Sequence, residues 1–283
     1  MSPFFTIITS TYNAAATLPR LLDSLASQTC RDFNWIVQDG ASSDTTMQIV
    51  EQYRDHLPEI LANSDKDSGI YDAWNKAIDH WQDNMGEWVL FLGADDRLVS
   101  EDILAKVQER ISNLPEDIIF AAGDMIYLDE KGEAYSSFAA PHNDIAFAQR
   151  FRGMPVPHTA LFTRKSVIQH KFDASFRIAG DFDFMLREFR TPAQMKQLDL
   201  LITYMGYGGI STNTTTCDLG NKEVLFIVKK YSFYEFILFK FNHKKSHISK
   251  KFKNYLLQSK VGTSVFHILK KLKMGFFKWI KIY

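Results

Sequence analysis

The feature that most constrains the fold is an alternation of short apolar runs with segments of helical periodicity. Runs rich in β-branched and aromatic residues occur at 4–9, 33–38, around Ile60, 88–92 and 118–122. Between them, apolar residues recur every three or four positions, at 18–25, 47–53, 70–81 and 102–111. Strands separated by helices of about ten to fifteen residues are typical of βαβ units. The sequence therefore predicts an α/β fold with a mainly parallel sheet flanked by helices.

Polar side chains follow three of these predicted strands at the point where each strand ends. The three clusters lie at 9–13, 39–44 and 93–96. Each cluster alone is explained by turn formation, because Asn, Asp, Ser and Gly are common in turns. In open α/β sheets, however, ligands bind beyond the carboxyl ends of the strands. Three polar clusters at one edge therefore favour a binding site there.

Asp95 and Asp96 are adjacent carboxylates that directly follow an entirely apolar strand, 88–92. A divalent cation relieves their repulsion, and oxygen ligands without a His or Cys cluster favour Mg²⁺ or Mn²⁺ over Zn²⁺. The alternative is an acidic pair at a helix N-terminus, which the helix dipole also favours. The sequence has no GxGxxG after the first strand and no GxxxxGK[ST], which disfavours dinucleotide binding and P-loop chemistry. A nucleotide could still stack on Tyr12 and bond to Asp39.

Charge is unevenly distributed along the chain. The formal net charge is zero, but residues 222–283 contain 15 Lys, no Arg and two acids, a net charge of +13. Residues 1–221 therefore carry a net charge of −13. From residue 261 onward, apolar residues recur at three- or four-residue steps between lysines, with Trp279 as an anchor. This pattern is typical of a basic amphipathic helix in a membrane interface, where lysines attract anionic headgroups.

Three alternatives exist for this basic extension: packing on the acidic body, a dimer contact, and RNA binding. No Arg-rich or RRM-like motif supports RNA, so we expect contact with a membrane surface through 222–283 and no nucleic acid. No run of about 18 uncharged apolar residues is present, and the N-terminus lacks the basic region of a signal peptide. Cys30 and Cys217 form neither a disulfide framework nor a metal-ligand spacing. We therefore expect a cytoplasmic protein, peripheral at the inner face of the cell membrane.

Four motifs, in order, resemble those of the family 2 glycosyltransferases, which are inverting enzymes with a Rossmann-like fold of the GT-A type. The motifs are IITSTYN at 7–13, VQDGASSD at 37–44, SDKDSGIYDAWNKA at 64–77 and FLGADD at 91–96. The resemblance is specific over residues 4–100 and looser to about residue 210. Ala94 stands at the first position of the family's DxD-type metal motif, so the motif is shortened to Ala-Asp-Asp.

The resemblance implies a UDP-sugar donor site at these motifs. Ser10 and Tyr12 would flank the uracil and the ribose. Asp39 would accept a hydrogen bond from the uracil imide. Asp95 would face the ribose and the phosphates, and Asp96 together with Asp95 would hold Mn²⁺ or Mg²⁺.

Further side chains are expected around the donor and the acceptor. The resemblance places Lys66 and Asp67 near the uracil or the diphosphate. Tyr71 and Asn75 lie one helical turn apart and are expected to share the pocket face. His158 resembles a family position near the acceptor and the diphosphate. A lone histidine is otherwise more often structural.

Segment 177–185 resembles the family segment in which an acid–Asp pair supplies the catalytic base. Gly180 replaces the acid, and Asp181 aligns with the base. Asp181 would then remove the proton of the acceptor hydroxyl as its oxygen attacks the anomeric carbon, while the metal stabilises the leaving diphosphate. The alternative is that Asp181 only caps the helix that follows. Asp183, two residues on, would point away within a helix and is the weaker candidate.

The resemblance implies an inverting hexosyltransferase that is metal-dependent. Its donor would be a UDP-sugar, with glucose, galactose and N-acetylglucosamine all open. Its acceptor would be a glycan on a polyprenyl diphosphate lipid, in O-antigen or capsule assembly. We expect a catalytic domain at 1–215, with a nucleotide-sugar half at 1–115 and an acceptor half at 116–215, and a helical extension at 216–283. The alternative is a non-catalytic nucleotide-sugar-binding or membrane-attached assembly protein of the same fold.

Overall fold

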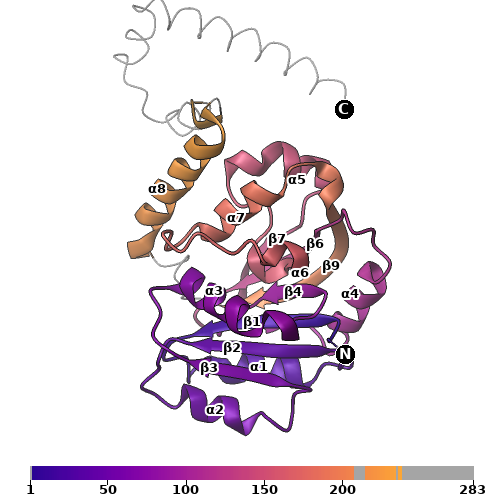
Figure 1. Cartoon of the computed structure of the whole chain (residues 1–283), viewed down its shortest axis with the longest axis vertical. Helices are drawn as coiled ribbons and strands as arrows, with labels where there is room; N and C mark the ends of the chain where they lie inside the picture. The colour runs from indigo at the N-terminus through magenta and orange to yellow at the C-terminus, as the bar shows by residue number, and fades with distance from the viewer. Residues whose placement is uncertain (1, 207–213, 234, 238–283) are drawn as a thin grey trace, which may run out of the picture. The chain divides into compact units, whose positions relative to one another are not determined.

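The computed structural model describes residues 2–206, 214–233 and 235–237 of the chain. The chain divides into two compact units, residues 1–231 and residues 232–283. Within the described residues, the first unit holds one nine-stranded sheet and the helices around it (Figure 1). The predicted amphipathic helix beyond residue 261, including Trp279, lies outside the described residues.

The N-terminal half of the sheet is parallel and follows the predicted alternation. Its strands, in spatial order β3-β2-β1-β4, are β1 (Phe5–Thr11), β2 (Phe33–Asp39), β3 (Ile60–Ser64) and β4 (Trp88–Phe91). The helices between them are α1 (Leu18–Ala26), α2 (Thr46–Gln52) and α3 (Ile70–Trp81), with a short 3₁₀ helix at Gln82–Asn84. All seven residues of β2 are buried, as expected of a parallel strand covered on both faces.

The second half of the sheet is mostly antiparallel. After β4 the order continues β8-β6-β9-β5, with β8 (Leu161–Arg164), β6 (Phe120–Leu128), β9 (Met195–Met205) and β5 (Arg97–Leu98). The pair β6–β9 is parallel, whereas β4–β8, β6–β8 and β5–β9 are antiparallel, and β7 (Ala134–Phe138) forms a hairpin with β6. This arrangement confirms the predicted α/β class with a sheet that is parallel in its N-terminal half.

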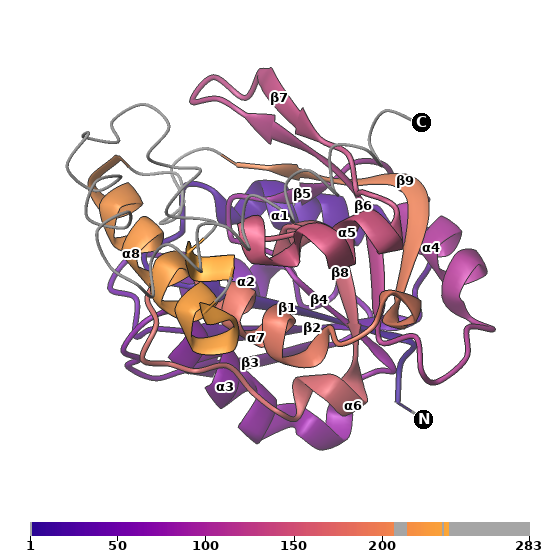
Figure 2. The same ribbon diagram turned by 90° about the horizontal axis from the view of Figure 1, so that it is seen from above.

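The remaining helices lie beside strands of the second half of the sheet or beside one another (Figure 2). They are α4 (Ile103–Ile111), α5 (Asn143–Gln149), α6 (Lys165–Ile168), α7 (Gly180–Glu188) and α8 (Thr214–Tyr231), with 3₁₀ turns at Arg150–Arg152, His158–Ala160 and Pro192–Gln194. α8 begins where the extension was expected to start, yet it belongs to the first compact unit and contacts α7. None of the described helices is both long enough and apolar enough to cross a membrane.

The strand register brings the predicted polar clusters to one edge. Thr11, Asp39 and Ser64 are partners across the ends of β1, β2 and β3. The Gly206 amide, just past β9, donates to Asp96 Oδ1 at 3.1 Å. The closure of the sheet by β9 therefore brings a second segment against the acidic pair, in addition to the strand that precedes it.

Candidate active site

Asp39 is the organising carboxylate at the end of β2. Its Oδ1 accepts hydrogen bonds from Thr11 Oγ1 at 2.8 Å and Ser42 Oγ at 2.5 Å. Its Oδ2 accepts from the Ser42 amide at 2.8 Å and Ser64 Oγ at 2.7 Å. Burial alone would raise the pKa of Asp39, but these hydrogen bonds outweigh it and lower the pKa. Asp39 is fully buried, and its hydrogen bonds with Thr11 and Ser64 join the ends of β1, β2 and β3.

The surface beside Asp39 is formed by Tyr12 and Asp67 around Gly40. A Cβ added at Gly40 would lie 2.6 Å from Asp67 Oδ2 and 3.4 Å from Tyr12 Cδ2, so a larger residue would have to displace the Asp67 carboxylate. Tyr12 is 70% exposed, which leaves its ring free to stack on a planar ligand. Burial, followed by the negative charges of neighbouring acids, raises the pKa of Asp67.

Ser10 and Lys66 lie at the margins of this surface. Ser10 is half-buried near the end of β1, one residue before Thr11. The side chain of Lys66 is exposed, and its backbone carbonyl accepts a hydrogen bond from Lys76 Nζ. The expected donor residues on β1, β2 and the loop after β3 are thus gathered at one edge.

Asp95 and Asp96 lie in the turn after β4. Asp96 is 1% exposed, and its Oδ2 accepts from the Gly93 amide at 2.7 Å. Burial, followed by the charge of Asp95, raises the pKa of Asp96 to about 7. Burial also raises the pKa of Asp95. Burial thus disfavours the charged form of both carboxyl groups, and the positive charge of His158 offsets this in part.

The acidic pair fits a cation that is shared with a nucleotide. Mg²⁺ and Mn²⁺ are commonly bound through one or two carboxylates, with phosphate oxygens and water completing the shell. Among the residues that the structure describes, no three His, Cys, Asp or Glu side chains meet to form a complete metal site. Asp95 and Asp96 would thus hold a cation together with oxygen ligands from a phosphate or water.

His158 connects the acidic pair to Asp181. Its Nδ1 lies 3.3 Å from Asp181 Oδ2, and both side chains are largely buried. Burial alone would lower the pKa of His158, but the carboxylates of Asp181, Asp96 and Asp95 outweigh it and raise the pKa. A cationic imidazole is thereby favoured at the centre of the three carboxylates.

Asp181 is the second residue of α7 and receives several contacts. Its Oδ1 accepts from the Phe182 amide at 2.8 Å and from Tyr71 Oη at 3.0 Å. The same Tyr71 hydroxyl lies 2.7 Å from the Ile178 carbonyl oxygen. Burial, followed by the negative charge of Asp181, raises the pKa of Tyr71 well above its usual value. Asp181 Oδ2 therefore faces His158, while Oδ1 is held by the protein.

The packing of Tyr71 explains why glycine, and not an acid, stands at position 180 before Asp181. A Cβ at this position would lie 2.7 Å from Cδ2 of the Tyr71 ring, closer than real Cβ contacts come. Tyr71 is 3% exposed and packs against Trp74 and Phe172, so its ring cannot swing aside. The space that an acidic side chain would need is filled by the tyrosine that contacts Asp181.

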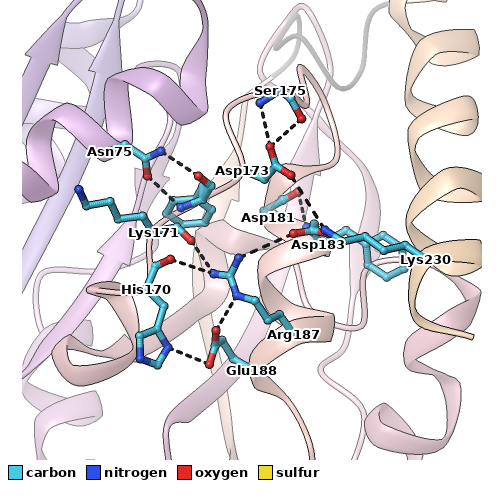
Figure 3. A network of polar contacts seen from close by, with 12 residues as sticks. Asn75, His170, Lys171, Asp173, Ser175, Asp181, Asp183, Arg187, Glu188 and Lys230 are labelled. Atoms are coloured by element: carbon cyan, nitrogen blue, oxygen red, sulfur yellow. Dashed lines mark hydrogen bonds and ion pairs between the residues drawn. The ribbon is translucent and has the colours of Figure 1, made fainter.

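Asn75 and Tyr71 both contact the chain that leads to α7. Asn75 Nδ2 donates to the Phe172 carbonyl oxygen at 2.8 Å, and the Phe172 amide donates to Asn75 Oδ1 at 2.9 Å. These two contacts fix the start of segment 172–179 to α3 (Figure 3). Tyr71 and Asn75, which were expected to line the donor pocket, therefore contact the segment that leads to Asp181.

Sequence reasoning missed the role of α8 at this segment. Glu223 accepts hydrogen bonds from the amides of Arg177, Ile178 and Ala179, each at 2.9 Å. Lys230 Nζ lies 2.9 Å from Oδ1 of Asp183, which is fully buried (Figure 3). The available signal was that Glu223 is one of only two acids among the lysines of 222–283.

Comparison with known proteins gives one family. The model for "Glycosyl transferase family 2" matches residues 6–172. A "PGL/p-HBAD biosynthesis glycosyltransferase" of Mycobacterium tuberculosis is 34% identical over 216 residues, which are 74% of this chain and 80% of that protein. The "Poly(ribitol-phosphate) beta-N-acetylglucosaminyltransferase TarS" of Staphylococcus aureus is 34% identical over 116 residues, 39% of this chain and 20% of TarS.

Solved structures share the fold. S. aureus TarS 1–349 in complex with UDP superposes with a TM-score of 0.62 at 19% identity, covering 92% of this chain and 76% of that one. The mannosyltransferase PcManGT of Pyrobaculum calidifontis, in complex with GDP-Man and Mn²⁺, gives 0.60 at 16% identity, covering 99% and 83%. These likenesses confirm the α/β fold predicted from the motifs, including its GT-A character.

Proposed function

The chain belongs to glycosyltransferase family 2, and we propose that it is an inverting enzyme that moves a hexose from a UDP-sugar to a glycan acceptor. The observation that carries this proposal is the group of Asp181, His158, Asp95 and Asp96. In this group the Asp181 carboxylate contacts His158, and the charges of Asp181, Asp96 and Asp95 raise the pKa of His158. Such a group supplies a base on one side and a charged site for a diphosphate on the other.

Asp181 is the proposed catalytic base. Its Oδ1 is held by Tyr71 and the Phe182 amide, which leaves Oδ2 to accept the proton of the acceptor hydroxyl. The acceptor oxygen forms a bond to the anomeric carbon as the bond from that carbon to the UDP oxygen breaks. Attack from the face opposite the leaving group inverts the configuration at the anomeric carbon.

Asp95, Asp96 and His158 are proposed for the leaving-group side. Asp95 and Asp96 would hold Mn²⁺ or Mg²⁺, which when bound neutralises charge that develops on the diphosphate. His158, placed among three carboxylates, would donate a hydrogen bond to the diphosphate or the acceptor. Asp181 Oδ2 orients the imidazole from the other side.

The nucleotide is proposed to bind at the Tyr12 edge. The exposed Tyr12 ring would stack on uracil, with Ser10 toward the ribose and Lys66 and Asp67 toward the uracil or the diphosphate. The Asp39 carboxylate already accepts four hydrogen bonds, from Thr11, Ser42 and Ser64, which use its lone-pair sites. Contact with the uracil imide therefore requires Ser42 or Ser64 to turn away. The complexes of TarS with UDP and UDP-GlcNAc support a UDP-sugar donor.

The donor sugar is proposed to be glucose, galactose or N-acetylglucosamine, since the site residues do not discriminate among them. The acceptor is proposed to be a glycan on a polyprenyl diphosphate lipid of O-antigen or capsule assembly. The basic residues 222–283 support a position at the inner face of the cell membrane, where such a lipid is reached. Tyr71 and Asn75 are proposed to position the acceptor-side segment rather than to contact the donor.

Calorimetric titration of UDP into the full chain tests this function, first with Mn²⁺ and then with EDTA. We expect binding that is at least about tenfold tighter with the metal, because the two carboxylates repel the diphosphate when no metal lies between them. Incubation with each UDP-hexose and a polyprenyl-diphosphate-linked sugar should then release UDP and give an inverted product. Binding of UDP without any transfer would favour the non-catalytic alternative. Absence of UDP binding in both conditions would contradict the proposed donor.

A further inference from the structure

One face of α8 is fitted to the segment that precedes α7. Gly220, Glu223, Ile227 and Lys230 recur at three- and four-residue steps, which places them along one side of a helix. A Cβ at Gly220 would lie 3.1 Å from Ile178 Cγ2, so glycine lets the helix approach closely. Ile227 is fully buried. This face thus contacts the catalytic half of the chain, with Lys230 at its partly exposed end.

Glu223 binds three consecutive backbone amides at the start of that segment. Oε1 accepts from Arg177, and Oε2 accepts from Ile178 and Ala179, all at 2.9 Å. Ala179 is the N-cap of α7, so its amide lies at the positive end of the helix dipole. Hydrogen bonds from such amides to a carboxylate are charge-assisted and stronger than neutral ones.

The Ile178 peptide is held from both sides. Its amide donates to Glu223 of α8, and its carbonyl oxygen lies 2.7 Å from the Tyr71 hydroxyl of α3, whose single proton it shares with Asp181 Oδ1. Three residues later the same chain presents Asp181, which also contacts Tyr71. A displacement of this peptide would therefore move the Asp181 carboxylate relative to His158 and the acidic pair.

We infer that Glu223 is a positioning residue for the transfer reaction, and that α8 is part of the catalytic apparatus through it. The inference rests on the proposed function, because it takes Asp181 as the base. Glu223 touches neither donor nor acceptor in this scheme. Its carboxylate holds segment 177–179 so that Asp181 meets the acceptor hydroxyl at the geometry needed for proton transfer.

Glu223→Gln tests the inference, because glutamine keeps the shape but has one acceptor oxygen for three amides. We expect kcat to fall by about 10- to 100-fold, as for a small misplacement of a reacting group, with the KM for the donor sugar unchanged. The affinity for UDP should stay within about twofold, since no donor residue is altered. Asp218→Asn is the matched control, because it removes an exposed carboxylate from the same helix and should leave kcat unchanged.

Hydrogen exchange gives a readout that does not depend on activity. In Glu223→Gln the amides of 177–179 should exchange at least about tenfold faster than in the wild type, while those of β1 and β2 stay protected. Faster exchange at 177–179 with an unchanged kcat would overturn the positioning role. Unchanged exchange would also overturn it, because the amides would then not depend on Glu223.

A double-variant cycle with Tyr71→Phe distinguishes a shared action from general destabilisation. If both side chains act on the Ile178 peptide, the loss of kcat in the double variant should be smaller than the product of the single losses. Multiplicative losses would contradict a common target. If the wild type itself transfers no sugar, the proposed function fails, whereas the exchange experiment still reports whether Glu223 holds the segment.

Discussion

At the scale of single residues, the site depends on how the two oxygens of Asp181 are used. One oxygen is occupied by Tyr71 and the Phe182 amide, and the other faces His158. A carboxylate held in this way keeps a fixed orientation but still offers a lone pair to a substrate hydroxyl. The buried Tyr71 ring, for which Gly180 leaves room, is therefore part of what orients the proposed base.

Asp181→Asn should abolish transfer and leave UDP binding intact. The amide keeps the size of the side chain but cannot take up a proton, and general base catalysis contributes roughly 10²–10⁴-fold. Single-turnover transfer rates and UDP titration on the same preparation check this. Asp183→Asn is not a suitable control, because Asp183 pairs with Lys230, so Asp55→Asn at an exposed turn serves instead. Full activity of Asp181→Asn would exclude Asp181 as the base.

Gly180→Ala should destabilise the protein by about 1–3 kcal/mol, as overpacking does in well-packed cores. The added Cβ would press on the Tyr71 ring, which is enclosed by Trp74 and Phe172. The sign of the change in unfolding free energy is informative, because Gly→Ala within a helix otherwise stabilises a protein by roughly 0.5–1 kcal/mol. Urea unfolding of this variant and of Gly180→Ala/Tyr71→Leu measures it. The second substitution should recover part of the loss if the clash is real.

The stability contributed by His158 should decrease as the pH rises. The folded protein raises the pKa of His158, so the contribution is fully present below the unfolded value of about 6.5 and is lost as the pH rises through the folded pKa. The difference in unfolding free energy between the wild type and His158→Gln should therefore be larger at pH 6 than at pH 9. In an Asp181→Asn background this pH dependence should shrink. A difference that grows with pH would contradict a cationic imidazole here.

At the scale of elements, the contact of α8 with α7 depends on a buried charge. Asp183 is fully buried, and Lys230 of α8 lies 2.9 Å from its Oδ1, while Arg187 lies 3.8 Å from its Oδ2. The Lys230 side chain is 41% exposed, so water screens the pair in part. The two helices are thus held by one ion pair at this end and by Glu223 at the other.

Lys230→Met should destabilise the protein by about 1–3 kcal/mol, because it removes the closest cation from a buried carboxylate. The exposed Lys222 on the same helix offers the matched control Lys222→Met, for which no change is expected. Adding Asp183→Asn should restore much of the stability, since the buried charge is then absent. Equal stabilities of Lys230→Met and the wild type in urea would show that Arg187 alone compensates Asp183.

Most helices and strands of the first half follow from local sequence pattern. The helix expected over 70–81 is α3, and the expected strands lie within a few residues of β1 to β4. Apolar side chains that recur every two or every 3.6 residues mark the buried face of a strand or a helix. In the first half, these faces pack against segments that are close in the sequence. The gathering of Asp39, Asp67 and Tyr12 at one edge was also predictable, because parallel strands end on the same side.

The arrangement of the second half was not predictable in the same way. The two-residue strand β5 exists only because β9 pairs with it from more than a hundred positions away in the sequence. Glu223 was assigned by composition to a basic extension, whereas its partners are three backbone amides that no sequence pattern marks. Tyr71 and Asn75 were correctly expected near each other, but their contacts with 172–181 are tertiary.

At the scale of the whole chain, the boundary between the compact units separates two expected functions. Residues 1–231 hold the site and α8, whereas 232–283 hold 12 of the 15 lysines of the basic extension. The predicted membrane contact therefore belongs mainly to the second unit. A truncation inside α8 would also remove the ion pair between Lys230 and Asp183. Its effect on the site could then not be separated from its effect on membrane binding.

Removal of residues 232–283 should abolish binding to vesicles that contain anionic lipid and leave UDP affinity unchanged. Each lysine near such a surface contributes about 1 kcal/mol, and this attraction weakens as salt is added. Flotation with phosphatidylglycerol vesicles at low and high salt measures the loss, with phosphatidylcholine vesicles as the control. Undiminished flotation of residues 1–231 would place the membrane contact elsewhere.

The hydrogen bonds that hold the Ile178 peptide between α3 and α8 matter when segments are exchanged between related enzymes. The segment that presents Asp181 lies beyond residue 172, where the match to the family model ends, and it is held by α3 and by α8. A chimera that takes a foreign second half without its own α8 would inherit the proposed base but lose the carboxylate proposed to orient it. A graft intended to change acceptor preference should therefore carry residues 173–231 as one block.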